Sequence, residues 1–163
     1  MRSSCYLGLF GPDDLSDLIA LDTDPGVREF LGGPVEPANA ERRALAHISG
    51  TTGEVEWAIR RVGDDAFLGI ISLHPHHDGE DTEVSYALLP RHQGHGHATE
   101  ALRLVLKHAA SVLGLDRLVA ETQSRNVKSM RLLARVGMKL ERTVIRFGEE
   151  QSIHGISLPV GKA

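Results

Sequence analysis

A glycine-rich turn between an apolar run and a long amphipathic segment constrains this chain more than any other feature. The turn is Gly94-His95-Gly96, and apolar side chains recur behind it at helical spacing over residues 98–113. Glycine has no Cβ, so the backbone N–H groups of such a turn can approach a ligand closely. A helix that begins there adds unpaired N–H donors and a partial positive charge. The sequence therefore predicts a phosphate or pyrophosphate site at this turn, with a tight turn that binds nothing as the alternative.

The residues before the turn have the pattern of strands. Residues 55–62 and 83–89 alternate apolar and polar side chains, and residues 67–73 are almost all apolar. Their short connections predict an antiparallel meander. We expect the remaining strands at residues 7–10, 117–122, 138–147 and 151–160, and the remaining helical segments near residues 15–19, 24–30, 37–48 and 126–136. This order of elements predicts an α+β fold.

Composition excludes several classes of protein. The chain has 163 residues, so we expect a single domain over residues 1–163. No apolar run has the length of a membrane span, the first residues lack the apolar stretch of a secretory signal, and one cysteine, Cys5, cannot form an intrachain disulfide. The formal net charge of −4 argues against a general nucleic-acid binder. We expect a cytoplasmic monomer or homodimer without nucleic-acid or membrane partners.

Two other phosphate-binding patterns fit the turn less well. A P-loop is excluded because no Gly-Lys-Ser/Thr follows. A dinucleotide fold would use Glu121, which lies at about the right distance, but Thr99 stands where that fingerprint has glycine or alanine. The chain beyond the turn is also short for a doubly wound sheet. A nucleotide-binding oxidoreductase stays as a minor hypothesis.

The turn and its surroundings resemble a known family. Arg91-x-x-Gly94-x-Gly96 resembles the Arg/Gln-x-x-Gly-x-Gly/Ala loop of the GNAT acyl-CoA N-acyltransferases. Residues 94–101 (Gly-His-Gly-His-Ala-Thr-Glu-Ala) are similar to the loop and helix start of its ribosomal-protein-alanine (RimJ/RimL-like) acetyltransferase branch. Segments 24–33 and 126–138 resemble the same branch, so the likeness covers nearly the whole chain. It implies a GNAT-like α+β fold, with a mixed, mostly antiparallel central sheet flanked by helices on both faces.

The resemblance implies an N-acetyltransferase that uses acetyl-CoA. The acceptor would be a primary amine of a protein N-terminus, or a small-molecule, polyamine or antibiotic amine, and it would attack directly in a ternary complex. The residues implied to bind the donor are Leu88, Leu89, Arg91, Gln93, Gly94, His95, Gly96, His97, Ala98, Thr99, Asn126 and Ser129.

Two catalytic residues are implied, each with an alternative. Glu83 lies on the strand that leads to the turn, where it would remove the amine proton directly or through water, and an exposed surface carboxylate is the alternative. Many GNAT enzymes protonate the departing thiolate with a tyrosine, but Leu133 stands at that position, so Ser129 is the candidate donor. Asn126 is a helix cap, a donor ligand, or both.

Other residues depart from the family pattern or carry a different chemistry. Gln93 stands where the branch often has an aromatic residue and His95 where it has Lys or Arg, which leaves a catalytically inactive CoA-binding module as the second hypothesis. Residues 74–78 include three histidines and an aspartate, which are side chains that bind zinc. Because polar loop runs of this kind are usually solvated, we predict no metal site.

Overall fold

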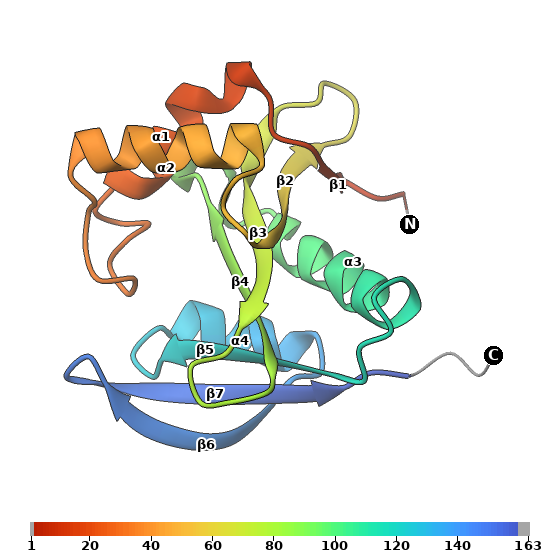
Figure 1. The fold of residues 1–163 in the computed structure, drawn as a ribbon. Helices are drawn as coiled ribbons and strands as arrows, with labels where there is room; N and C mark the ends of the chain where they lie inside the picture. The colour runs from red at the N-terminus through yellow and green to blue at the C-terminus, as the bar shows by residue number, and fades with distance from the viewer. Residues whose placement is uncertain (1, 160–163) are drawn as a thin grey trace. The chain divides into compact units, whose positions relative to one another are not determined.

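The computed structural model describes residues 2–159, in which seven strands are hydrogen-bonded in the order β1-β2-β3-β4-β5-β7-β6 (Figure 1). The strands are β1 (Cys5–Gly8), β2 (Val55–Arg61), β3 (Phe67–Pro75), β4 (Thr82–Leu88), β5 (Arg117–Gln123), β6 (Lys139–Arg146) and β7 (Glu149–Ser157). The helices are α1 (Leu15–Thr23), α2 (Pro37–Ser49), α3 (His97–Ser111) and α4 (Val127–Arg135), with short 3-10 helices at Pro12–Asp14 and Pro90–His92. The pairs β1–β2, β5–β7 and β6–β7 are antiparallel and β4–β5 is parallel. The predicted α+β fold with a mostly antiparallel sheet is confirmed.

The predicted short helical turn after Asp24 is present and does not lengthen into a helix. Residues 25–30 form hydrogen-bonded turns. The Asp24 carboxylate accepts a hydrogen bond from Val27 N–H at 2.9 Å, and Arg28 N–H donates to the Asp24 carbonyl at 3.1 Å. This arrangement starts like a capped helix, but the following glycines, Gly32 and Gly33, adopt left-handed conformations and end it. The first strand also forms earlier than predicted, and Val160, expected in the last strand, lies outside the described residues.

The chain packs as two compact units, the first made of residues 1–72 and 86–101 and the second of residues 73–85 and 102–163. In the first unit, α1 and α2 pack against each other, and their apolar sides share a core with side chains of β2 and β3. The buried members of this core are Leu18, Leu21, Ala44, Ala58, Phe67 and Leu89. Because Leu89 belongs to this core, the end of β4 and the start of the glycine turn are fixed within the first unit.

The second unit contains the antiparallel strands β5, β7 and β6, which lie side by side in Figure 1. Leu118 and Val119 of β5, Leu133 of α4 and Met138 are fully or almost fully buried in it. The parallel pairing of β4 with β5 places Glu83 opposite Val119. This register fixes which side chains surround Glu83.

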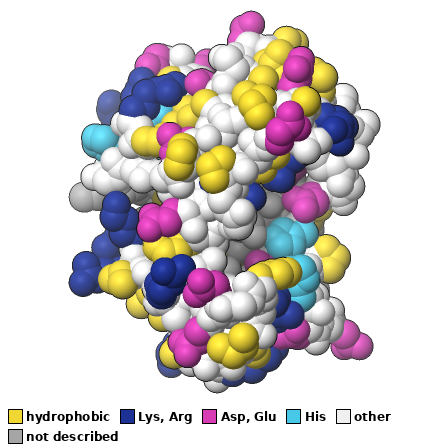
Figure 2. Space-filling view, turned by 90° about the vertical axis from the view of Figure 1, so that its left-hand side faces the viewer, with side chains coloured by type: hydrophobic (Ala, Val, Ile, Leu, Met, Phe, Trp, Pro, Cys, Tyr) yellow, Lys and Arg dark blue, Asp and Glu magenta, His cyan; other side chains and the backbone are white. Residues whose placement is uncertain are grey.

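A helix that spans a membrane must be both long and apolar. Among residues 2–159, none of the helices combines the length and the hydropathy needed to cross a bilayer. On the face drawn in Figure 2, Lys and Arg side chains lie among Asp and Glu side chains.

Candidate active site

The glycine turn of the first unit has the geometry that the sequence predicts. Gly94 and Gly96 have φ angles of +79° and +82°, which side chains with a Cβ rarely adopt. A Cβ added to either residue would meet no atom within 4 Å, so the space beside the turn is open. The helix α3 begins at His97, and its first backbone hydrogen bond runs from Glu100 N–H to the Gly96 carbonyl at 3.1 Å. A helix N-terminus of this kind, with its dipole directed at the turn, is a type of site at which proteins bind anions.

Two predicted ligand residues brace the turn. The Gln93 side-chain amide donates to the Leu88 carbonyl at 3.0 Å, which joins the end of β4 to the turn. The Arg91 guanidinium donates to Asp17 of α1 at 3.1 Å. Both side chains therefore have structural partners in addition to the ligand role that the resemblance implies.

Two histidines beside the turn, His92 and His97, are held toward the neutral form. His92 and His97 are buried, and burial lowers the pKa of each imidazole below its ordinary value. The Nδ1 atom of His97 lies 3.2 Å from the Ser4 hydroxyl. His95 is exposed. The backbone N–H groups and the helix end are therefore the groups of the turn that would attract an anion.

Glu83 of the second unit is a buried carboxylate, so the alternative of an exposed surface residue is wrong. Its side chain is 8% exposed. Burial raises the pKa of Glu83 to about 7, and repulsion from the Glu121 carboxylate adds to the rise, while His77 and a hydrogen bond from Ser85 oppose it. A carboxylate that titrates near neutral pH is suited to accept a proton from a substrate.

The side chains around Glu83 come from four strands and one loop. Glu121 lies two residues beyond Val119, the partner of Glu83, and so shares its face of the sheet. His76 Nε2 lies 3.9 Å from Glu83 Oε1 and 3.6 Å from Glu121 Oε1. Arg146 donates twice to Glu121 Oε1, at 3.1 and 2.9 Å. On the other side, the Ser85 hydroxyl donates to Glu83 Oε2 at 3.5 Å and contacts His74 Nε2 at 2.7 Å.

Sequence reasoning missed His76, Glu121 and Arg146 as neighbours of Glu83. Glu121 was considered as a ribose ligand and His76 as part of a solvated loop, whereas the His76 side chain is 2% exposed. Strand alternation would have placed Glu121 correctly had the parallel pairing of β4 and β5 been known. No local pattern marks Arg146.

The helix α4 begins at a side-chain cap. Asn126 Oδ1 accepts a hydrogen bond from Ser129 N–H at 3.2 Å, so the helix-cap interpretation of Asn126 is confirmed. Ser129 is partly buried in the first turn, and Leu133 is fully buried. The residue at the position of the family's tyrosine is therefore a core side chain.

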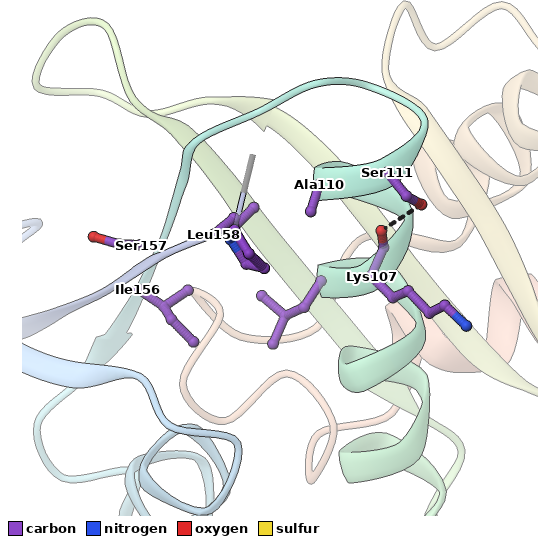
Figure 3. Close-up of a pocket in the computed structure, with 8 residues that line it drawn as sticks. Lys107, Ala110, Ser111, Ile156, Ser157 and Leu158 are labelled. Atoms are coloured by element: carbon purple, nitrogen blue, oxygen red, sulfur yellow. Dashed lines mark hydrogen bonds between the residues drawn. The ribbon is translucent and has the colours of Figure 1, made fainter. Parts of the chain in front are cut away.

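Two further features carry no acid–base chemistry. A cavity of about 400 Å³ in the second unit lies between the end of α3 and the end of β7, and Figure 3 shows Ile156 and Leu158 facing it. Its lining residues include neither a carboxylate nor an imidazole. Cys5 is buried in the first unit, and burial, with Glu100 adding to the effect, raises the pKa of its thiol to about 12. A thiol of this kind is a poor nucleophile.

Comparison with known proteins gives consistent results. Residues 6–139 match the family model described as the acetyltransferase (GNAT) domain. The probable N-acetyltransferase YjcK of Bacillus subtilis is 36% identical over 90 residues, which cover 54% of this chain and 50% of that protein. The chain thus spans about half the length of the curated relatives that it matches.

Solved structures show the same fold. An acetyltransferase of the GNAT family from Bacillus anthracis aligns with a TM-score of 0.83 at 18% identity, covering 96% of each chain. The spermidine N-acetyltransferase of Vibrio cholerae, solved with CoA and spermine, aligns with a TM-score of 0.82 at 17% identity, covering 98% of each chain.

Proposed function

Because the chain belongs to the GNAT acetyltransferase family, we propose that it transfers an acetyl group from acetyl-CoA to a primary amine. The observation that carries this proposal is Glu83, a buried carboxylate whose pKa is raised to about 7 on the strand that leads into the glycine turn. The family match supports acetyl-CoA as the donor, and the open turn at Gly94 and Gly96 fits its pyrophosphate.

Glu83 is the proposed general base. An alkylammonium group has a pKa of about 10, so most of the acceptor is protonated at neutral pH. Glu83 removes one proton, directly or through water, and the amine nitrogen then attacks the thioester carbon. A C–N bond forms and the C–S bond breaks. The amine nitrogen gives up its second proton as the amide forms. The leaving CoA thiolate takes one proton from the proposed donor, Ser129, which regains that second proton from the nitrogen.

The backbone near the end of β4 is the proposed site of carbonyl polarisation. Leu89 N–H donates to the Leu68 carbonyl of β3 at 3.0 Å, and the Leu88 carbonyl accepts from Gln93. Successive N–H groups along an extended strand point in opposite directions, so Leu88 N–H is directed away from β3. We assign this N–H to the thioester oxygen and this stretch of β4 to the amides of the pantetheine arm.

The remaining donor contacts follow the resemblance. Residues 94–99 would bind the pyrophosphate through backbone N–H groups, and Asn126 would add a hydrogen bond to the pantetheine arm while it caps α4. Membership of the RimJ/RimL-like branch is part of the proposal. The acceptor classes are a protein N-terminus and a polyamine or antibiotic amine, and the spermine complex of the Vibrio cholerae neighbour supports screening polyamines first.

Acetyl-CoA, and not NAD, is expected to stabilise the protein. The glycine turn provides N–H donors for a pyrophosphate, whereas Thr99 occupies the place of the dinucleotide fingerprint's last small residue. At a concentration of 100 times Kd, acetyl-CoA should raise the free energy of unfolding by about 2.7 kcal/mol, measured by thermal or urea denaturation. Equal stabilisation by NAD would contradict the donor assignment. Stabilisation by CoA without thiol release across an amine panel would identify an inactive CoA-binding module.

Replacement of Ser129 by alanine is expected to lower kcat by roughly 10- to 150-fold with little change in acetyl-CoA affinity. The CoA thiol has a pKa of about 8.5, so the thiolate leaves without full protonation and one hydrogen bond to it contributes about 1.5–3 kcal/mol. Steady-state thiol release measures kcat, and calorimetry measures the donor affinity. Ser111→Ala on α3, whose hydroxyl donates to the Lys107 carbonyl at 2.8 Å, is the matched control.

Two other outcomes would contradict this role of Ser129. A loss of CoA affinity with kcat preserved would make Ser129 a donor-binding residue. An unchanged enzyme would make it a helix-surface serine.

A further inference from the structure

His76 is a buried polar residue that the proposed reaction does not yet use. It follows β3, and its N–H donates to the Asp81 carbonyl at 2.9 Å, which closes the loop that leads to β4. Within the described part of the chain, His76 Nε2 and Glu83 Oε1 are buried atoms without a hydrogen-bond partner. Since such atoms are costly to bury, their mutual approach at 3.9 Å calls for a functional explanation.

The backbone fixes the position of the hydrogen on His76. Asp78 N–H donates to His76 Nδ1 at 3.4 Å, so Nδ1 presents a lone pair. In the neutral imidazole the other nitrogen then carries the hydrogen. This Nε2–H faces Glu121 Oε1 at 3.6 Å and Glu83 Oε1 at 3.9 Å. Hydrogen bonds of catalytic groups are often long before the substrate binds and shorten in the reactive complex.

The other charged groups around Glu83 are not placed to donate a hydrogen bond to its Oε1 atom. Arg146 pairs with Glu121 and also with Asp78, at 2.9 and 2.8 Å, so it neutralises carboxylates other than Glu83. His74 Nε2 lies 4.0 Å from Glu83 Oε2, on the side of the Ser85 hydroxyl. His77 is exposed.

Neither His154 of β7 nor a bound cation accounts for the environment of Glu83 as well as His76 does. His154 of β7 pairs with Ala120 and therefore lies on the opposite face of the sheet from Glu121. The ligand atoms of His76, Glu83 and Glu121 lie within 4.8 Å of one another, a spacing that a cation could occupy. The guanidinium already bound to Glu121 Oε1 disfavours a second positive charge there.

We propose that His76 is a positioning residue for Glu83, which holds carboxylate Oε1 with its Nε2–H and leaves Oε2 to accept the proton of the amine. This inference rests on the proposed function of Glu83 as the base. It assigns a stated task to each oxygen: Oε1 is held by the imidazole, and Oε2 lies beside Ser85. Because the hydrogen bond favours the ionised carboxylate, His76 also keeps Glu83 available as a base toward lower pH.

The test compares variants that keep or lose the Nε2 donor. In His76→Leu the acid limb of the kcat/KM profile should move up by about one pH unit, since a hydrogen bond to a charged group is worth about that much. The rate should therefore fall about tenfold below the midpoint and recover above it. His76→Gln should restore the wild-type midpoint, because its amide nitrogen reaches the place of Nε2. His76→Asn places its amide near Nδ1 instead and should behave like the leucine variant.

If His76→Leu does not fold, the comparison of His76→Asn with His76→Gln still tests whether the Nε2 donor sets the midpoint. His77→Leu removes the exposed imidazole next in the chain, which opposes the rise in the pKa of Glu83 through its charge, and should raise the midpoint by less than His76→Asn does. An unchanged midpoint in His76→Asn, or failure of His76→Gln to restore it, would overturn the inference. A shift of the wild-type midpoint by EDTA would show a bound cation in place of the His76 hydrogen bond and would overturn it as well.

A second measurement separates this inference from the proposed function. Carbon-13 NMR of labelled glutamate carboxyl groups, with Glu83→Gln to assign the signal, follows the titration of Glu83 without any acceptor. A raised midpoint in His76→Asn supports the positioning role whether or not Glu83 is the base. Full activity of Glu83→Gln would remove the proposed base while leaving that titration result intact.

Discussion

Glu83→Gln is expected to lower kcat about 100-fold while the affinity for acetyl-CoA stays unchanged. The variant removes the group that takes the amine proton and keeps the length of the side chain, with an amide in place of the carboxylate. The deficit should shrink as pH rises, because free amine then forms without a base. Thiol release measured from about pH 7 to about pH 10, the range between the pKa of Glu83 and that of the amine, follows this change. Normal turnover at neutral pH would return Glu83 to a structural role.

The same variant is expected to be more stable than the wild type above pH 7. Folding raises the pKa of Glu83 from 4.5 to about 7, so the native state binds more protons than the unfolded state between these values. The cost of ionising the buried carboxylate therefore grows over this range and stays constant above it, at about 3 kcal/mol. Glutamine carries no such cost. Urea unfolding at pH 8 should show the gain, and unfolding at pH 4 should show almost none.

These two expectations together exclude misfolding as the reason for lost turnover. A stabilised variant with intact donor binding and a low kcat identifies a missing chemical group. If the variant is less stable at pH 8, burial is not what sets the titration of Glu83.

Gly96→Val is expected to weaken acetyl-CoA binding more than about 100-fold, enough to remove the stabilisation by the donor. The φ angle of +82° is strained for valine, and the branched side chain would fill the open space beside the turn. Calorimetry and thermal shift measure the loss. Gly114→Val is the matched control, because Gly114 follows α3, has a φ of +65° and also has no atom within 4 Å of an added Cβ.

The control should lose folding stability as Gly96→Val does, but it should keep its acetyl-CoA affinity. Equal loss of binding in both variants would mean that backbone strain, and not occlusion of the turn, explains the effect. Unchanged affinity in Gly96→Val would contradict the placement of the pyrophosphate.

The glycine turn was predictable from the sequence because its cause is local. Two glycines directly before a strongly amphipathic segment allow few structures other than a turn that opens a helix. The strand that carries Glu83 was predictable for the same reason. The short helical turn after Asp24 was predictable too, because an aspartate cap and two following glycines mark its start and its end locally.

The surroundings of Glu83 depend on contacts between distant segments. Whether Glu121 meets Glu83 is decided by the register of a parallel strand pair, which no pattern within either strand records. The burial of His76 depends on the closure of its loop onto Asp81. Arg146 lies 25 residues beyond Glu121 and reaches it because β6 and β5 both pair with β7.

The burial of the Cys5 thiol has a practical consequence for assays that detect the CoA thiol released by acetyl transfer. Aromatic disulfide reagents report free CoA by reacting with thiolates, and a protein's own cysteines usually add to the signal. With a pKa of about 12, Cys5 is a thiolate in roughly one molecule in ten thousand at pH 8, and its side chain is fully buried. It is the chain's one cysteine. We therefore expect the folded protein to add little background in such an assay, so that slow acetyl transfer by the variants can be measured.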